Sequence, residues 1–466
     1  MQAVLDLIEK RRDRSVEILA DLLRIPSIST DPSRAQDVRR AAEMLVDVFR
    51  ENGVESVEIQ PTAGHPVVYA EWKGAPGAPT VLVYGHYDVQ PIADESEWTS
   101  PPFEPRIDDG KIWARGATDD KGQLLVHVLG AGAHLGANGK LPVNVKFLLE
   151  GEEEIGSEHL EEFVEAHRDR LSCDTIVISD TAMYAPGVPS ICTGLRGIAY
   201  VQFTLRGAAS DLHSGGFGGA VDNPAIVMGR LLGGLKDEAT GRVLVEGFYD
   251  GLDEIPEEER AGWAGLPEPE ERFREAAGVR HLYGEEGFTV LERVWARPSL
   301  DVNGVWGGFT GKGSMTVLPA RASAKVSMRL VPGQSPADVA AKLKRHIEAH
   351  LPETVVLQEF LDLHGGRPWT CSVDEPAVKA AFRAVERGFG TPPVPTREGG
   401  SIPIVQMFTE VLEAPAVLMG FGLPDEAAHG PDEHFDLENY QGGIRSSACY
   451  LEELAGVLAA GPRRAS

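Results

Sequence analysis

Apolar residues recur at helical spacing over the first part of the chain. The first run, which includes Val4, Ile8 and Leu19, ends at Pro26, and a second run covers residues 35–51. One face of the second predicted helix carries Ala42, Leu45, Val46 and Phe49. These patterns predict amphipathic helices that pack against a core.

Continuous apolar runs farther along predict strands that are buried on both faces, as in a parallel sheet. The runs cover residues 80–84, 142–149 and 175–179, and helical patterns separate them. This alternation is typical of an α/β domain. Each run leads directly into polar residues, namely His86 and Asp88, residues 150–154, and Asp180. Because such sheets bind ligands at the carboxyl ends of their strands, we expect a functional site along this edge.

The pattern changes in the second half of the chain. Residues 198–206 and 323–330 alternate between apolar and polar, as antiparallel strands with one covered face do. Residues 250–298 are rich in Glu, Pro and Gly and predict short helices and loops, and residues 439–458 predict a closing helix. We therefore predict an α/β domain with a mostly parallel sheet, formed by residues 1–194 and 369–466. A separate α+β domain, residues 195–368, is inserted into it.

Composition excludes several classes of partner. The 466 residues include 71 acidic and 44 basic ones, which gives a formal charge of −27. This charge disfavours nucleic acid and anionic membrane as partners, because both require basic patches. No apolar run reaches the ~18–20 residues of a membrane span, and the first residues show no signal pattern. The four cysteines are scattered without a C-x-x-C pair, so we expect a cytoplasmic protein without a cysteine zinc site.

Residues 116–122, Gly-Ala-Thr-Asp-Asp-Lys-Gly, join a predicted strand to a predicted helix. Alone, such a segment is more often a solvated loop. Together with His86, His429 and the carboxylates after the other strands, it predicts a pair of metal sites that share one carboxylate. Two Zn²⁺ ions, three carboxylates and neutral histidines leave a charge that suits a bridging hydroxide. Of the adjacent glutamates at residues 152–154, one could bind metal and another act as a base, and the residues alone leave the order open.

Four motifs as a set resemble the family of two-metal exopeptidases that contains carnosinase-type dipeptidases, carboxypeptidase G and aminoacylase-1. The motifs are Gly-His-Tyr-Asp-Val-Gln-Pro (85–91), Arg-Gly-Ala-Thr-Asp-Asp-Lys-Gly (115–122), Glu-Gly-Glu-Glu-Glu-Ile-Gly-Ser (150–157) and Ile-Ser-Asp (178–180). Later stretches are similar to the carnosinase branch: Leu-Arg-Gly (195–197), Asp-Leu-His-Ser-Gly (211–215), Gly-Ser-Met-Thr-Val-Leu-Pro (313–319), Met-Arg-Leu-Val-Pro (328–332) and Gly-Gly-Ser-Ile-Pro (399–403). The resemblance covers nearly the whole chain.

The resemblance implies a role for each residue of the metal site. His86 and Asp180 would bind one metal ion, Glu154 and His429 the other, and Asp119 would bridge the two. Glu153 would be the general base, and Asp88 would support His86. A cis peptide bond would follow Asp119.

The resemblance also implies roles in the inserted domain, which would serve as a lid and dimerisation domain. His213 would stabilise the oxyanion across a homodimer, from the partner chain. Arg329 would bind the carboxylate of the substrate. Thr316 and Ser401 would add hydrogen bonds to the substrate.

These expectations define a metallopeptidase of dipeptides or short peptides with a free C-terminal carboxylate. A metal-bridged hydroxide would attack the peptide bond with Glu153 as general base. The cofactors would be two divalent metal ions per chain, Zn²⁺ or, with the same ligands, Mn²⁺ or Co²⁺. One alternative is an N-acyl-amino-acid deacylase with the same two-metal site. The other is a non-catalytic metal- or peptide-binding relative, which would have lost a ligand or the base, whereas every position is filled here.

Overall fold

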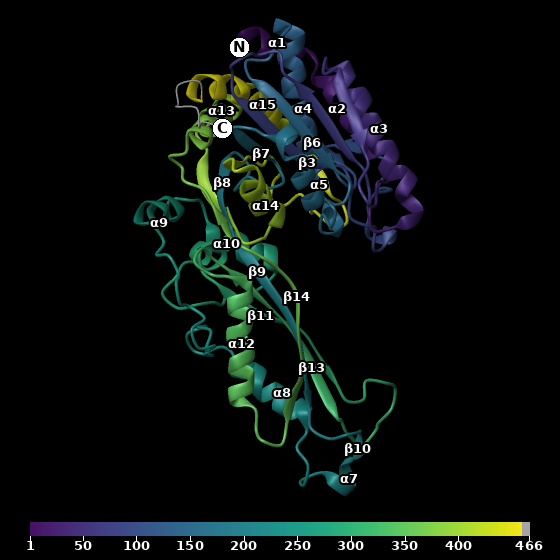
Figure 1. Ribbon diagram of the computed structural model, residues 1–466, viewed down its shortest axis with the longest axis vertical. Helices are drawn as coiled ribbons and strands as arrows, with labels where there is room; N and C mark the ends of the chain where they lie inside the picture. The colour runs from purple at the N-terminus through teal and green to yellow at the C-terminus, as the bar shows by residue number, and fades with distance from the viewer. Residues whose placement is uncertain (459–466) are drawn as a thin grey trace. The chain divides into compact units, whose positions relative to one another are not determined.

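The computed structural model describes residues 1–458, and the chain divides into two compact units (Figure 1). Of the described residues, unit 1 comprises 1–193, 371–396 and those from 407 onward, and unit 2 comprises 194–370 and 397–406. These divisions lie close to the expected domain boundaries at 194 and 368. Residues 397–406, which the sequence analysis assigned to the first domain, cluster instead with unit 2. The reason is local, because Ser401 and Arg397 bind partners within unit 2.

The helices of unit 1 come from the first and the last part of the chain. They are α1 (Gln2–Lys10), α2 (Arg12–Leu23), α3 (Ala35–Glu51), α4 (Lys121–Asn138), α5 (Leu160–Ala166), α6 (Arg168–Leu171), α13 (Pro376–Phe389) and α15 (Leu437–Val457), with 3₁₀ turns η1 (Pro32–Arg34), η2 (Glu95–Glu97) and η3 (Glu153–Ile155). The strands are β1 (Ser56–Gln60), β2 (Val67–Trp72), β3 (Thr80–His86), β4 (Arg106–Asp108), β5 (Lys111–Trp113), β6 (Asn144–Glu150), β7 (Thr175–Ile178), β17 (Ala416–Leu418) and β18 (His434–Asp436). Three further elements span the divisions between units: β8 (Ser190–Leu195), β16 (Val394–Glu398) and α14 (Pro403–Leu412).

The central sheet of unit 1 has the order β1-β2-β6-β3-β7-β17-β8, so β3 lies in its interior. Strands β6, β3, β7 and β17 are parallel neighbours, while β1, β2 and β8 pair antiparallel. This agrees with the predicted mostly parallel α/β sheet. The parallel register aligns His86 with Glu150, so the carboxyl ends of β3 and β6 meet at one edge.

Both faces of this sheet are covered. On one face, Val81, Val83 and Val177 join a core that also contains buried residues of α3, α4, α13 and α15. On the other face, the Tyr84 ring lies 5.1 Å from the Phe408 ring of α14. Residues buried on both sides explain the continuous apolar runs of the sequence.

Unit 2 is built around the antiparallel sheet β11-β13-β9-β14. Its core lies between this sheet and helices α8 and α12 (Figure 1). The elements are β9 (Gly197–Arg206), β10 (Leu212–His213), α7 (Ser214–Phe217), α8 (Pro224–Gly233), α9 (Glu257–Ala264), α10 (Pro269–Ala277), α11 (Val290–Trp295), β11 (Ser299–Gly307), β12 (Val317–Leu318), β13 (Arg321–Leu330), α12 (Pro336–His350), β14 (Val356–Gly366) and β15 (Trp369–Thr370).

The side chains of β13 alternate between the two faces of the unit 2 sheet. Val326, Met328 and Leu330 are buried in the core, whereas Arg329 points to the opposite side and is half-buried. The sequence pattern predicted this alternation. It did not predict β11, because most residues of that strand are exposed and therefore show no buried stripe.

Within residues 1–458, every helix is too short or too polar to cross a membrane.

Candidate metal centre

The carboxyl ends of three parallel strands, β3, β6 and β7, lead into residues of the predicted site. His86 ends β3, Glu153 and Glu154 form the turn after β6, and Asp180 lies two residues after β7. His429 lies between β17 and β18, and Asp119 directly precedes the Asp120 cap of α4. All these residues belong to unit 1.

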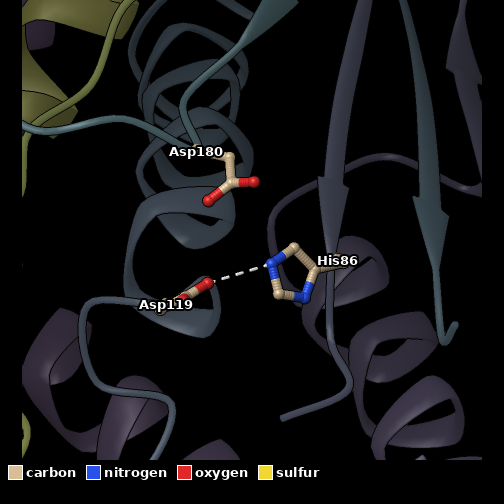
Figure 2. A group of neighbouring side chains, drawn as sticks. All are labelled: His86, Asp119 and Asp180. Carbon is tan, nitrogen blue, oxygen red and sulfur yellow. Dashed lines mark hydrogen bonds and ion pairs between the residues drawn. The ribbon is translucent and has the colours of Figure 1, made fainter. Parts of the chain in front are cut away.

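His86, Asp119 and Asp180 form the first group of possible ligands. Their ligand atoms all lie within 4.8 Å of one another. His86 Nε2 lies 3.1 Å from Asp119 Oδ1. Figure 2 shows that the three side chains point toward one another, with the Asp180 carboxylate facing the other two.

Asp119, Glu154 and His429 form the second group. His429 Nε2 lies 2.8 Å from Asp119 Oδ2 and 3.3 Å from Glu154 Oε2. Asp119 therefore directs one carboxylate oxygen toward each histidine, which is the geometry of a bridging ligand. The peptide bond between Asp119 and Asp120 is cis, as the resemblance implied.

Asp88 connects the two strand ends. Its Oδ1 lies 3.4 Å from His86 Nδ1, and the Asp88 carbonyl oxygen is nearer to that nitrogen, at 3.1 Å. The two carboxylate oxygens accept the backbone N–H groups of Glu153 and Glu154 at 3.2 and 3.1 Å. Asp88 thus orients His86 mainly through its backbone, and its carboxylate holds the acidic turn.

Local contacts distinguish the three consecutive glutamates. Glu152 is buried and bound by the His65 N–H and the His159 ring, at 2.9 and 3.0 Å, so its carboxylate is engaged elsewhere. Glu154 faces His429 and accepts a 2.7 Å hydrogen bond from Gln90 Nε2. Glu153, between them, forms no side-chain hydrogen bond or ion pair within the described part of the chain.

The group concentrates negative charge in a buried place. Burial, with the nearby charge of Asp119, raises the pKa of Asp180 to about 7 despite an opposing effect of His86. Burial likewise raises the pKa of Glu153 well above its usual value, with His86 opposing and Asp180 and Glu154 adding to the rise. Hydrogen bonds to Asp119 and Glu154 raise the pKa of His429 to about 10. The carboxylates of the group therefore repel one another, and a nearby positive charge would stabilise their ionised forms.

A divalent cation fits this donor set. Imidazole nitrogen and carboxylate oxygen are the ligands of catalytic zinc sites and also admit Mn²⁺ and Co²⁺. A cation in each group would offset the repulsion among the three carboxylates. No group of this kind occurs elsewhere among residues 1–458.

In unit 2, His213 lies beside Thr316. Strands β10 and β12 pair His213 with Val317, and His213 Nε2 lies 3.4 Å from Thr316 Oγ1. His213 Nδ1 accepts the Gly215 N–H at 3.0 Å. In the neutral ring, the proton is therefore on Nε2, which makes this exposed atom a hydrogen-bond donor.

Arg329 and Ser401 also lie together in unit 2. Arg329 Nη1 donates to Ser401 Oγ at 3.0 Å, and Ser401 Oγ donates to the Arg196 carbonyl oxygen at 2.5 Å. Burial, together with the charge of Arg329, lowers the pKa of Arg196 to about 10. Neither guanidinium forms an ion pair with a residue in the range 1–458. The two arginines therefore form a partly buried positive pair.

Sequence reasoning missed three residues that contact these sites. Gln90 lies in the motif at 85–91, but nothing in the pattern distinguishes it from a loop residue. Arg196 lies in the Leu-Arg-Gly motif, but nothing in the sequence shows that it lies near Arg329, which is 133 residues farther along the chain. Glu433 follows His429 by four residues and accepts the backbone N–H of Asp119 at 3.2 Å. An acidic residue so near a predicted ligand was the one signal available.

A parallel-sheet domain with two groups of histidine and carboxylate side chains that could hold metal ions is typical of a metal-dependent hydrolase. The family model described as Peptidase family M20/M25/M40 matches residues 82–453. The chain therefore belongs to this peptidase family and is a metal-dependent peptidase, as the motifs indicated.

Similar proteins match along almost the whole chain. The Cys-Gly metallodipeptidase dug1 of Schizosaccharomyces pombe is 32% identical, over 97% of this chain and 98% of the relative. The Beta-Ala-His dipeptidase of Homo sapiens is 34% identical, over 98% and 93%. The solved structure of the dipeptidase Dug1p from Saccharomyces cerevisiae has a TM-score of 0.82 at 31% identity, and covers 98% of both chains. All three names describe dipeptidases, so the deacylase alternative is not favoured.

Proposed function

We propose that the protein is a two-metal dipeptidase that hydrolyses dipeptides or short peptides with a free C-terminal carboxylate. The observation that carries the proposal is the Asp119 carboxylate, which faces His86 with one oxygen and His429 with the other. The dipeptidase names of the relatives support the substrate class.

We assign one metal ion to His86, Asp119 and Asp180, and the second to Asp119, Glu154 and His429. Zn²⁺ is the proposed ion, because it accepts both histidine and carboxylate ligands readily, and Mn²⁺ or Co²⁺ would fit the same atoms. When bound, the ions would supply Lewis-acid polarisation of the scissile carbonyl and an activated water.

Glu153 is the proposed general base. Its neighbour Glu154 faces the second ligand group, and the Glu153 backbone is held by Asp88. The Glu153 side chain is half-buried and has no hydrogen-bond or ion-pair partner within residues 1–458, so its carboxylate can accept a proton from the attacking water. It would then return that proton to the leaving amine.

Arg329 is the proposed binding site for the substrate carboxylate. Arg329 lies next to a second arginine, Arg196, and both lack an ion-pair partner in the described chain. A carboxylate would relieve the repulsion between two guanidinium groups and bind Arg329 with two hydrogen bonds. Ser401, which already holds Arg329, would help to fix its position.

We also propose a homodimer in which His213 of one chain serves the site of the other. Its Nε2–H is a suitable donor for an oxyanion, and Thr316 Oγ1 lies beside it. The edge strands β11 and β14 of unit 2 expose apolar side chains that a second copy could cover: Val302, Val305, Trp306, Val356, Leu361 and Leu363. A cytoplasmic location stays a prediction that rests on the sequence alone.

Metal analysis combined with a substrate panel tests the function. Purified protein is stripped by a chelator, then Zn²⁺, Mn²⁺ or Co²⁺ is added back separately. The panel contains Cys-Gly, β-Ala-His, an unrelated dipeptide and an N-acetyl amino acid. We expect two ions per chain and metal-dependent cleavage of dipeptides over the N-acetyl compound. Full activity of metal-free protein, or a clear preference for the N-acetyl compound, would refute the proposal.

A further inference from the structure

Arg115 and Glu433 form a buried ion pair that hydrogen-bonds to the backbone of two predicted metal ligands, His429 and Asp119. Their side chains are 3% and 1% exposed, and Arg115 Nη1 lies 2.7 Å from Glu433 Oε2. The pair lies where two segments meet: β5 leads into Arg115, and β18 directly follows Glu433. The strands themselves pair His434 with Trp113, and the Ala114 N–H donates to the Glu433 carbonyl at 2.9 Å.

The Glu433 carboxylate is saturated by donors from the segment that carries Asp119. Its Oε2 accepts from Arg115 and from the Gly116 N–H, the latter at 2.9 Å. Its Oε1 accepts the N–H groups of Thr118 and Asp119 at 3.1 and 3.2 Å. One side chain thus sets the path of the backbone up to the carboxylate that both ligand groups share.

Arg115 extends the same network to the other ligand segment. Its Nη2 donates to the His429 carbonyl oxygen at 3.0 Å. His429 has φ = 64°, an unfavourable conformation for a residue with a side chain, and its side chain is 56% exposed. Packing alone does not hold such a residue, so a hydrogen bond to its backbone matters for where its ring lies.

We propose that the Arg115–Glu433 pair positions two of the metal ligands relative to each other: Glu433 fixes Asp119, and Arg115 fixes His429. The inference rests on the proposed two-metal site. Neither residue contacts a metal ligand's donor atom, so both act as positioning residues. A buried ion pair is weak evidence for stability, because an apolar pair of similar volume often serves as well. An apolar pair could not, however, accept the N–H groups of two segments and bind a carbonyl.

We expect substitutions of the two residues to weaken metal binding in different ways. In Glu433→Gln, one of the two acceptor oxygens becomes an NH2 group that faces two N–H donors, so the segment that carries Asp119 shifts and both ions bind more weakly. In Arg115→Lys, the positive charge remains, but the side chain no longer has the two guanidinium nitrogens that donate to Glu433 and to His429. That variant should weaken chiefly the ion bound by His429. Outer partners of metal ligands typically change metal affinity by about 10–100-fold, which is the expected range for each weakened ion.

The experiment titrates metal-free protein with Zn²⁺ against a competing chelator and records the visible absorption of the Co²⁺-loaded forms. Glu285→Gln is the matched control, because Glu285 forms a similarly enclosed, two-bonded ion pair with Arg297 in unit 2. The thermal midpoint of each metal-free variant is measured as well. We expect all three variants to lose some thermal stability, but only Glu433→Gln and Arg115→Lys to change Zn²⁺ affinity and the Co²⁺ spectrum.

Unchanged Zn²⁺ affinity in both variants, with two ions bound by the wild type, would overturn this inference and leave the proposed function intact. An equal loss of affinity in Glu285→Gln would also overturn it, since general destabilisation would then explain the effect. A wild-type protein that binds no divalent ion would refute the metal site itself. Should Glu433→Gln fail to fold, Arg115→Lys alone decides the question through the second ion.

Discussion

Glu153 and Glu154 are neighbours in the sequence with different surroundings. Glu154 faces His429 and Gln90, whereas Glu153 has neither contact. We predict that Glu153→Gln keeps both metal ions but lowers kcat by about 10²–10⁴-fold, the usual contribution of a general base. Glu154→Gln should lose or weaken one ion. Metal content and kcat of each variant provide the measurement, and an exchange of the two phenotypes would contradict the assignment.

We expect His127 of α4 to make the stability of the protein depend on pH. It is buried, and its ring nitrogens contact Ser447 Oγ and Ser179 Oγ at 3.0 and 2.6 Å. Burial lowers the pKa of His127 to about 3. Because the unfolded chain binds this proton at a higher pH than the folded chain, stability is lost as the pH falls below about 6.5.

The corresponding prediction compares wild type with His127→Gln, which cannot titrate. Between pH 7 and pH 5, the wild type should lose about 2 kcal/mol more unfolding free energy than the variant, at about 1.4 kcal/mol per pH unit below the unfolded pKa. Urea unfolding of both metal-free proteins at each pH measures the difference. Equal losses would show that His127 does not remain neutral in the folded protein.

At the scale of elements, α13 and α15 approach closely through glycine. A Cβ atom on Gly388 of α13 would lie 2.0 Å from Ser446 Oγ and 2.8 Å from the Gly442 carbonyl oxygen of α15. We predict that Gly388→Ala destabilises the protein by about 1–3 kcal/mol, as overpacking of a core does. The thermal midpoint of the metal-free protein measures this effect.

Gly456→Ala is the control for that prediction. Gly456 also lies in α15, but a Cβ atom there would meet no atom within 4 Å. Because alanine favours the helix over glycine by about 0.5–1 kcal/mol, this variant should be as stable as the wild type or slightly more stable. A similar loss in both variants would contradict the role of close helix packing.

At the scale of the whole molecule, the substrate carboxylate should be recognised by unit 2. For wild type, amidation of a dipeptide at its C-terminus should lower kcat/KM by an amount that corresponds to a loss of about 2–4 kcal/mol of transition-state binding, because the half-buried Arg329 loses its charged partner. Arg329→Ala should abolish this difference while leaving metal content unchanged. The measurement is kcat/KM for the dipeptide and its amide with each enzyme.

Arg321→Ala provides the matched control, because Arg321 begins the same strand but is exposed and bonded to Gln358. That variant should retain the preference for the free carboxylate. Equal rates of the wild type on the dipeptide and its amide would remove the proposed role of Arg329.

The homodimer proposal predicts complementation between inactive chains. His213→Ala and Glu153→Gln subunits, each nearly inactive alone, should regain activity after subunit exchange. The reason is that one site of the mixed dimer would contain both an intact Glu153 and the partner chain's intact histidine. Turnover before and after exchange is compared with each variant treated alone. No recovery despite confirmed exchange would indicate that each chain completes its own site.

The sequence by itself determined the central parallel strands and the main helices of unit 1, and the set of chemical groups. Strands buried on both faces, such as β3 and β6, leave continuous apolar runs, and parallel strands bring their carboxyl ends to one edge. For this reason, His86, Asp180 and the acidic turn could be expected together before any coordinates. The motif resemblance then supplied the family. The sequence did not predict strand β11, because a largely exposed strand has no pattern of buried apolar residues.

Only the tertiary structure showed how the surroundings of these groups differ. Three consecutive glutamates look alike in the sequence, yet Glu152 is occupied by His65 and His159, and Glu154 faces His429. The Arg115–Glu433 pair joins residues 318 positions apart, and no periodicity reports such a contact. Burial, charge and donor geometry are properties of the folded surroundings of a residue, whereas the sequence pattern records only which side chains are available.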